Sequence, residues 1–314
     1  MKLNEIEIPF ADKNKFSIEI KRSSDSIKLL YLTFESNKIK SVDEFKQLMK
    51  NDSLNINNQW ITYDFELLME LTEVKKFDDS YIVTIPGNYT IGEFYQIASQ
   101  HNIFNIYFDI KNIHMIDKIK ICYEMNYYSD NIRKELCDKH QERIFQTITP
   151  LINHHIDSNH IDTDTHIYNC CPNRIAKGYF ILGDLNLIEL LKIQLNGQDR
   201  LKLNNVQLNM ICHKISDKLH YFSFNNKNNY RDMTYESYDG SSNNFRIDTL
   251  KFCLKFKKSK YTDSSIKIYE LELNIFRYMN GICGIFFPDQ TTLINQSVKK
   301  IESTDNLEYN WSTR

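Results

Sequence analysis

The sequence is poor in residues that interrupt regular structure and carries no excess of positive charge. It has only 8 glycines and 5 prolines in 314 residues, which is low for an all-β protein. The formal net charge is −2 and the pI is about 6.5, so no basic field exists to hold a nucleic acid nonspecifically. No apolar run approaches membrane-spanning length, and the N-terminus lacks the apolar core of a signal peptide. We therefore predict a soluble product made in a cytoplasm, with no nucleic-acid partner and no direct membrane insertion.

Motifs of enzyme chemistry are also missing. The sequence contains no Gly-rich phosphate loop, no nucleophile elbow and no His-Glu-x-x-His zinc motif. Its 7 cysteines follow no repeating pattern, which is typical of reduced, buried thiols in a cytosolic protein. We therefore assign no catalytic, cofactor-binding or metal-binding residue, and we predict that the protein is not an enzyme.

One segment near the middle of the chain concentrates residue types that bind metals. The spacing of its histidines and cysteines matches no familiar zinc finger, and its acidic part lacks the glycine and the terminal glutamate of a calcium loop. We interpret the segment as a polar interdomain linker, with a metal site as the alternative. The residues concerned are His154, His155, Asp157, His160, Asp162, Asp164, His166, Cys170 and Cys171.

Other polar residues invite a catalytic interpretation without requiring it. Glu270 and Glu272 share one face of a predicted strand, as the paired carboxylates of a glycosidase do, but no second acidic pair or aromatic sugar platform accompanies them. We interpret Arg246 and Asp248 as a turn-stabilising ion pair. His213 and His220 are interpreted as surface or hydrogen-bonded histidines.

Alternation of apolar and polar residues dominates the second half. Residues 191–195 alternate before Asn196-Gly197, a pair that favours a tight hairpin turn. Residues 250–257 alternate apolar side chains with lysines, which predicts a strand with a solvated lysine face. Residues 268–277 alternate in the same way. Several such strands, separated by Asn-, Ser- and Asp-rich turns, predict a β-sandwich or jelly roll.

The first half mixes predicted strands with predicted helices. Strand patterns cover 16–20, 27–34, 104–110 and 119–127. Ser41 with Glu44, and Thr90 with Glu93, predict two short helices that begin with capping boxes. A charged pattern over 129–147 predicts a further helix or helical turn. Residues 51–80 and 150–175 are polar and irregular, and Trp60 and Phe65 are the expected anchors of the first of these segments.

Four segments of the second half follow one another in a distinctive order: 195–200 (LNGQDR), 221–224 (YFSF), 241–248 (SSNNFRID) and 268–284, which ends in NGICG. This order resembles the C-terminal jelly roll of the major capsid proteins of nucleocytoplasmic large DNA viruses. The passage from a Tyr-rich strand into the charged segment 129–147 resembles the end of the first jelly roll in that family. Residues 22–27 resemble its early Arg-x-Gly-Asp-Leu turn. The abundance of Asn, Ile and Lys suits an AT-rich genome.

The resemblance implies an all-β fold of two consecutive antiparallel jelly-roll sandwiches, a double jelly roll, with a few short helices in loops. We expect an N-terminal jelly roll at 1–150, a polar linker at 151–171, a C-terminal jelly roll at 172–290 and a tail at 291–314. It further implies a capsid protein of the virion, synthesised in the host cytoplasm. Homotrimers would form the pseudo-hexagonal capsomers of an icosahedral shell and contact neighbouring capsomers and minor capsid proteins, without a cofactor.

The sequence also departs from the family pattern. Gln198 replaces the usual histidine, the turn at 245–248 lacks the usual serine, and no Gly-Gly-Gln-containing strand is found in the first half. The chain is also short for a major capsid protein. Two alternatives therefore stay open. One is a minor or reduced capsid paralogue, and the other is a jelly-roll carbohydrate-binding or glycan-acting virion protein.

Overall fold

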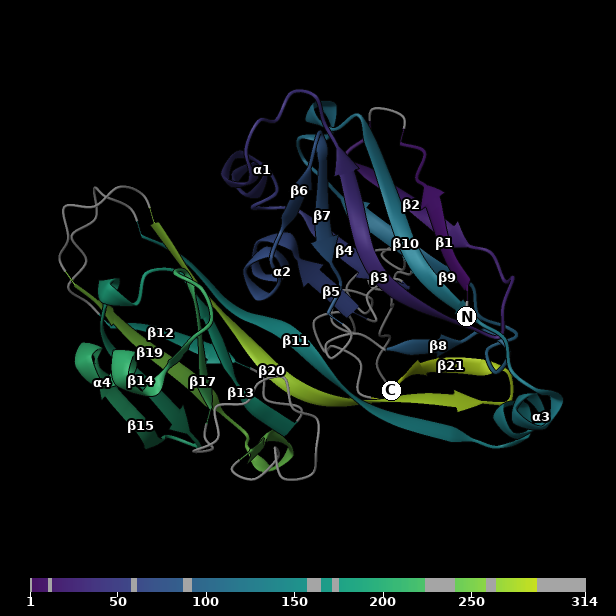
Figure 1. Cartoon of the computed structure of the whole chain (residues 1–314). Helices are drawn as coiled ribbons and strands as arrows, with labels where there is room; N and C mark the ends of the chain where they lie inside the picture. Colours follow the sequence, from purple (N-terminus) through teal and green to yellow (C-terminus); the bar gives the residue numbers. More distant parts are fainter. Residues whose placement is uncertain are drawn as a thin grey trace, which may run out of the picture.

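Two β-sandwiches, one from each half of the chain, make up the molecule (Figure 1). This computed structural model describes residues 2–10, 13–57, 61–86, 92–156, 165–170, 175–223, 241–257 and 264–286. Its strands form four antiparallel sheets, two in each sandwich. Within the described ranges, no helix is both long and apolar enough to cross a membrane.

The N-terminal sandwich encloses an apolar core in which Leu32, Phe34, Ile106 and Ile121 are completely buried. One of its sheets has the strand order β1-β10-β3-β7-β6, with β8 also paired to β3, and the other has the order β2-β9-β4-β5. The strands are β1 (Lys2–Glu7), β2 (Lys15–Ile20), β3 (Ser26–Glu35), β4 (Ser53–Ile56), β5 (Ile61–Asp64), β6 (Lys75–Phe77), β7 (Ser80–Thr84), β8 (Glu93–Tyr95), β9 (Phe104–Asp109) and β10 (Lys118–Asn126).

The C-terminal sandwich has a separate core, in which Ile188, Ile193, Leu254 and Ile268 are completely buried. One sheet has the order β11-β20-β13-β17-β16, with β18 paired to β13 and β21 to β20, and the other has the order β12-β19-β14-β15. The strands are β11 (Gln141–Ile156), β12 (Thr165–Cys170), β13 (Ile175–Leu182), β14 (Ile188–Leu195), β15 (Gln198–Asn204), β16 (His213–Lys214), β17 (Leu219–Ser223), β18 (Ser242–Asn243), β19 (Leu250–Phe256), β20 (Ser264–Met279) and β21 (Ile282–Ile285).

Short helices occupy the connections between strands. The predicted helix start at Ser41 is present, because the Ser41 hydroxyl accepts a hydrogen bond from the Glu44 amide at 3.1 Å. The second bond of a capping box is replaced, since the Glu44 carboxylate accepts from the Lys40 amide at 2.8 Å. The helices are α1 (Val42–Leu48), α2 (Phe65–Leu71), α3 (Asp130–Asp138) and α4 (Asn205–Ile211), with 3-10 turns η2 (Ile113–Met115), η3 (Leu185–Leu187) and η5 (Asn244–Arg246).

Helix α2 lies between the two sandwiches and is buried on both sides. Phe65 and Leu68 belong to the N-terminal core. Leu67 and Leu71 instead pack with Leu271 and its neighbours on the outer face of the β11-β20-β13-β17-β16 sheet. Because its apolar side chains are buried against both sandwiches, α2 fixes one sandwich against the other, and Glu66 and Glu70 are its polar positions.

Strands β11 and β20 also connect the two halves. They pair with each other along their whole lengths, through a β-bulge between Pro150 and Ile152. One end of the pair contributes Ile152 and Ile268 to the C-terminal core, whereas the other end contributes Phe276 and its neighbours to the N-terminal core. Figure 1 shows both strands running from the C-terminal sandwich to a position beneath the N-terminal one.

Most strands expected from alternation are present. Residues 191–195 lie in β14, and Asn196 and Gly197 take the positive φ angles, 50° and 77°, that a tight hairpin turn requires. Strand β19 buries Leu250 and leaves Lys251 half-buried, in agreement with the alternation over 250–257, although Cys253 is buried as well.

Several local predictions are wrong. The helix expected over 129–147 ends at Asp138, and the residues from Gln141 onward form β11, because pairing with β20 outweighs the charged local pattern. Glu93 begins a strand paired with β3 rather than a helix, and Thr90 lies outside the described residues. The supposedly irregular segment 51–80 contains β4, β5, α2 and β6, and Trp60 is outside the described residues.

The polar segment expected to be a linker also contains strands. Residues 151–156 complete β11, and the segment Thr165–Cys170 forms β12, which pairs with β19. Its composition is polar because β12 is an edge strand with alternating exposure, not because the chain is irregular there. The boundaries at 150 and 172 stay a prediction, and the tail 291–314 lies outside the described residues.

Candidate functional site

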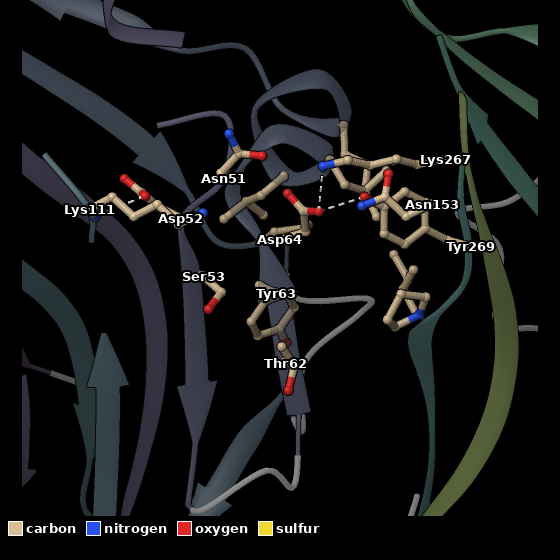
Figure 2. Close-up of a pocket in the computed structure, with 16 residues that line it drawn as sticks. Asn51, Asp52, Ser53, Thr62, Tyr63, Asp64, Lys111, Asn153, Lys267 and Tyr269 are labelled. Atoms are coloured by element: carbon tan, nitrogen blue, oxygen red, sulfur yellow. Dashed lines mark hydrogen bonds and ion pairs between the residues drawn. The ribbon is translucent and has the colours of Figure 1, made fainter. Parts of the chain in front are cut away.

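A cleft of about 320 Å³ lies between the two sandwiches (Figure 2). Its N-terminal wall comes from the turn after α1, from β4 and β5, and from α2. Its C-terminal wall is the outer face of β11 and β20. The β-bulge in β11 places Pro150 opposite Tyr269 and Asn153 opposite Lys267, so that the side chains of all four residues line the cleft.

A polar network crosses from one wall to the other. Asp64 caps the start of α2 by accepting a hydrogen bond from the Glu66 amide at 2.9 Å. Its other carboxylate oxygen accepts hydrogen bonds from Lys267 Nζ at 3.1 Å and from the Tyr269 hydroxyl at 2.6 Å. Lys267 Nζ also lies 2.7 Å from a Glu66 carboxylate oxygen. One lysine of the C-terminal sandwich is therefore held by two carboxylates of the N-terminal sandwich.

The environment of this network sets its protonation. Burial acts to lower the pKa of Lys267, and the charges of Asp64 and Glu66 outweigh it, so that the pKa is raised and the lysine stays charged. Burial also raises the pKa of the Tyr269 hydroxyl well above its ordinary value. Tyr269 therefore acts as a hydrogen-bond donor to Asp64 and not as an acid at neutral pH.

Asp52 lies beside the cleft in a different setting. One of its carboxylate oxygens accepts a hydrogen bond from the Lys111 amide at 3.0 Å. The other oxygen is buried and has no hydrogen-bond partner in the part of the chain that the structure describes. Burial is the main cause that raises the pKa of Asp52 to about 6.

The cleft offers hydrogen-bonding groups and apolar surface. Its described lining residues include no histidine and no cysteine. Asp64 accepts three hydrogen bonds, from the Glu66 amide, Lys267 and Tyr269. The arrangement is suited to binding a small molecule. Sequence reasoning missed it, although a lone lysine between Ile266 and Ile268 is a detectable signal.

The structure brings together part of the metal-binding candidates. His154 on β11 and His166 on β12 have ring centroids 4.4 Å apart, and His154 stacks on Phe256 at 4.6 Å. His155 is exposed, and the Tyr168 hydroxyl is hydrogen-bonded to His154 Nδ1. The described residues contain no group of three or more His, Cys, Asp or Glu placed to hold a metal. Cys170 is half-buried at the end of β12, and Asp157, His160, Asp162, Asp164 and Cys171 lie outside the described residues.

The two strand glutamates are buried. Glu270 accepts a hydrogen bond from the Asn244 amide at 2.7 Å, and Glu272 accepts one from the Thr147 hydroxyl at 3.2 Å. Asn274, on the same strand face, is buried too. These contacts tie η5 and β11 to β20.

The remaining single candidates are dispersed. His213 is exposed on β16, whereas His220 is buried on β17, and burial is the main cause that lowers its pKa. The ion pair expected between Arg246 and Asp248 is not among the ion pairs of the described residues. The backbone amide of Asp248 instead donates to the Asn196 side chain at 2.8 Å, and this bond fixes the turn.

An apolar surface is exposed on the outer face of β11, β20 and β21. Ile144 is 59% exposed and Ile282 is 57% exposed, and Met279 and Phe286 are also exposed. In antiparallel pairs, residues directly opposite each other share a face, so Met279 and Ile282 lie together. Arg277 lies on the same face, paired with Glu142 and placed 4.3 Å from the centre of the Phe286 ring.

The sequence matches no family model, and no curated protein matches it. Solved structures share its fold. The PBCV-1 virus capsid matches with a TM-score of 0.68 and 14% identity over 92% of this chain and 97% of that chain. PBCV-1 VP54, fitted into a reconstruction of the virophage Sputnik, matches with a TM-score of 0.63 and 14% identity over 92% of this chain and 97% of that chain. The Faustovirus major capsid protein matches with a TM-score of 0.57 and 5% identity over 87% and 90%.

These comparisons establish the class of the fold. The chain is a double jelly roll, all-β, with two consecutive antiparallel sandwiches and short helices in the connections. The fold class expected from the sequence is confirmed, and so is the resemblance to the double jelly-roll major capsid proteins at the level of the fold.

Proposed function

We propose that this chain is a structural subunit of a virion shell and acts by assembly rather than catalysis. The observation that carries the proposal is the length of the structural match. Both jelly rolls superpose together on a viral capsid protein, over 92% of this chain and 97% of that one. A likeness confined to one sandwich would have no such weight, because single jelly rolls host many unrelated functions.

The finer proposal is a homotrimer with approximate sixfold shape, which contacts neighbouring capsomers and minor capsid proteins. Two similar sandwiches per chain give six similar lobes when three chains close around an axis. The apolar face of β11, β20 and β21 supports this assembly, because burying Ile144, Met279, Ile282 and Phe286 against another copy removes apolar surface from water.

Light scattering after size-exclusion chromatography tests the proposal. We expect the full chain to elute with about three times the 37.5 kDa mass of one chain. The double variant Ile144→Asp with Ile282→Asp should reduce the mass to one chain, because two charges would have to be buried in the interface. The matched control is Val206→Asp. Val206 is also an exposed apolar residue, but it lies on α4 and not on β11, β20 or β21, so the substitution should leave the trimer intact. A wild-type chain that stays monomeric at millimolar concentration would contradict the proposal.

A further inference from the structure

The charges that line the cleft between the sandwiches are balanced. Among the lining residues, Asp52 and Asp64 are matched by Lys111 and Lys267, and Lys267 is already held by Asp64 and by Glu66, which does not line the cleft. A cationic ligand would meet two lysines, and an anionic ligand would meet two aspartates. Because neither sign of charge is favoured, electrostatic complementarity selects a neutral ligand.

Two side-chain amides at the cleft are available to form hydrogen bonds with a ligand. Asn51 and Asn153 are both exposed, and neither side chain has a hydrogen-bond partner within the described residues. Figure 2 shows them on opposite sides of Asp64, one from the turn after α1 and the other from β11. Each amide offers two N–H donors and one acceptor oxygen, the combination that pairs with hydroxyl groups, which both donate and accept.

The body of the cleft is apolar. Leu67 and Leu71 of α2, which Ile148 contacts directly, line it together with Pro150 of β11. The volume of about 320 Å³ lies at the lower end of the range for small-molecule sites, about 300–1,000 Å³. A ligand that fits must therefore be small and neutral, with apolar C–H surface and a rim of hydroxyls. A pyranose ring combines these properties.

We propose that this cleft binds a neutral sugar unit, with the amides of Asn51 and Asn153 hydrogen-bonded to its hydroxyls and the leucines of α2 against its C–H face. The inference does not depend on the shell role, because it rests on the described lining residues alone. A chain that fails to trimerise leaves it unaffected. A site between the two jelly rolls also means that an occupied cleft stabilises their relative position.

Saturation-transfer NMR on the full chain tests the charge selectivity. The probes are glucose, galactose and N-acetylglucosamine, compared with glucosamine and glucuronate, which keep the ring and add one charge of either sign. We expect at least one neutral sugar to bind saturably and each charged analogue to bind about tenfold more weakly, because it meets a like-charged residue. Absence of binding by all three neutral sugars, or stronger binding of a charged analogue, would overturn the proposal.

Substitutions locate the site. Asn51→Ala and Asn153→Ala should each weaken binding of the best neutral sugar about threefold to tenfold, because each removes one set of hydrogen bonds. Asn153→Trp should abolish binding, because the larger side chain would fill part of the cleft that Asn153 lines. Asn209→Ala, at an exposed asparagine of α4 outside the cleft, is the matched control and should bind as the wild type does. Equal binding by all four variants would place the sugar elsewhere and overturn the assignment.

Discussion

At the scale of single residues, Asp52 places a carboxylate oxygen in a buried position without a described hydrogen-bond partner. Its pKa in the folded chain, about 6, lies above its ordinary value of 3.8. The folded state therefore disfavours the ionised form. Burying the ionised carboxylate therefore lowers the free energy of unfolding. This loss is absent below about pH 4, where Asp52 is protonated in both the folded and the unfolded chain, and complete above about pH 6, where it is ionised in both.

We expect Asp52→Asn to stabilise the protein above pH 6 and to have little effect at pH 4, because the amide keeps the shape and removes the buried charge. The variant should raise the melting temperature by a few degrees at pH 7.5. Thermal unfolding of both proteins between pH 4 and pH 8 provides the measurement. A difference between them that does not change with pH would show that Asp52 carries no such cost.

Lys267 stabilises the folded chain, whereas the ionised Asp52 destabilises it. Its ammonium group is held by Asp64 and Glu66, and the side chain is only 9% exposed. Lys267→Met leaves two carboxylates facing each other in a buried interface, so we expect it to lower the free energy of unfolding by about 3 kcal/mol. Urea unfolding at pH 7 measures the loss.

The control for this substitution is Lys255→Met on β19. Lys255 pairs with Glu189 at 2.8 Å, but both side chains are substantially exposed, so water already screens the pair. We expect a loss below about 1 kcal/mol. Equal effects of the two substitutions would show that the network between the sandwiches is no stronger than a surface ion pair.

At the scale of elements, strand β13 depends on the absence of a side chain at Gly178. A Cβ placed there would lie 2.4 Å from the Phe222 carbonyl oxygen of the paired strand β17 and 2.6 Å from the Tyr221 hydroxyl. The backbone oxygen cannot move without breaking the ladder. Gly178→Ala should therefore lower the free energy of unfolding by about 1–3 kcal/mol.

Gly284 on β21 is the matched position, since a Cβ there would meet no atom within 4 Å. We expect Gly284→Ala to change stability by less than about 0.5 kcal/mol in the same urea experiment. A Gly178→Ala protein as stable as the Gly284→Ala protein would mean that β17 can shift away from β13.

Alternation was the sequence signal that predicted these elements best. In β2, β9, β10, β14 and β19 the alternation of apolar and polar residues agrees with the strand pairing, so the apolar side chains lie on the face that the sequence predicts to be buried. It fails where pairing partners are distant. The first residues of β11 follow a charged helix and carry polar side chains, and only their partner β20, more than a hundred residues away, makes them a strand.

The cleft could not be predicted from local patterns for the same reason. Asp64 and Lys267 are about two hundred positions apart, and each alone reads as an ordinary solvated charge. Even the burial of Glu270 has no local signal, because it depends on Asn244, which arrives from a separate loop. The order of the four C-terminal motifs predicted the fold, whereas contacts between the halves required the structure.

At the scale of the whole molecule, the two jelly rolls share structure. Phe276 and Tyr278 of β20 are buried in the N-terminal core, together with Phe145 of β11. In the other direction, Leu67 and Leu71 of α2 cover the outer face of the C-terminal sheet. Neither core is complete within the predicted ranges 1–150 and 172–290.

We therefore expect the fragments 1–150 and 172–290, produced separately, to fail to fold. The first lacks the aromatic side chains of β20 that complete its core. The second lacks β11 and exposes Phe180 and Leu271, which α2 and its surroundings cover in the intact chain. Circular dichroism and calorimetry on each fragment and on the mixture provide the measurement, with the full chain as control.

The equimolar mixture of the two fragments tests whether β11, β20 and α2 make the two jelly rolls one folding unit. If β11, β20 and α2 hold the two halves together, fragments refolded together should associate one to one and unfold in a single cooperative transition, which is also the transition we expect for the intact chain. The N-terminal fragment would then gain Phe276 and Tyr278, and the C-terminal fragment would gain the cover of α2, while Ile152 and β12 are absent from both. Two soluble fragments with separate cooperative transitions would instead show that each jelly roll is an independent folding unit, and that burial of α2 between them contributes only to their orientation.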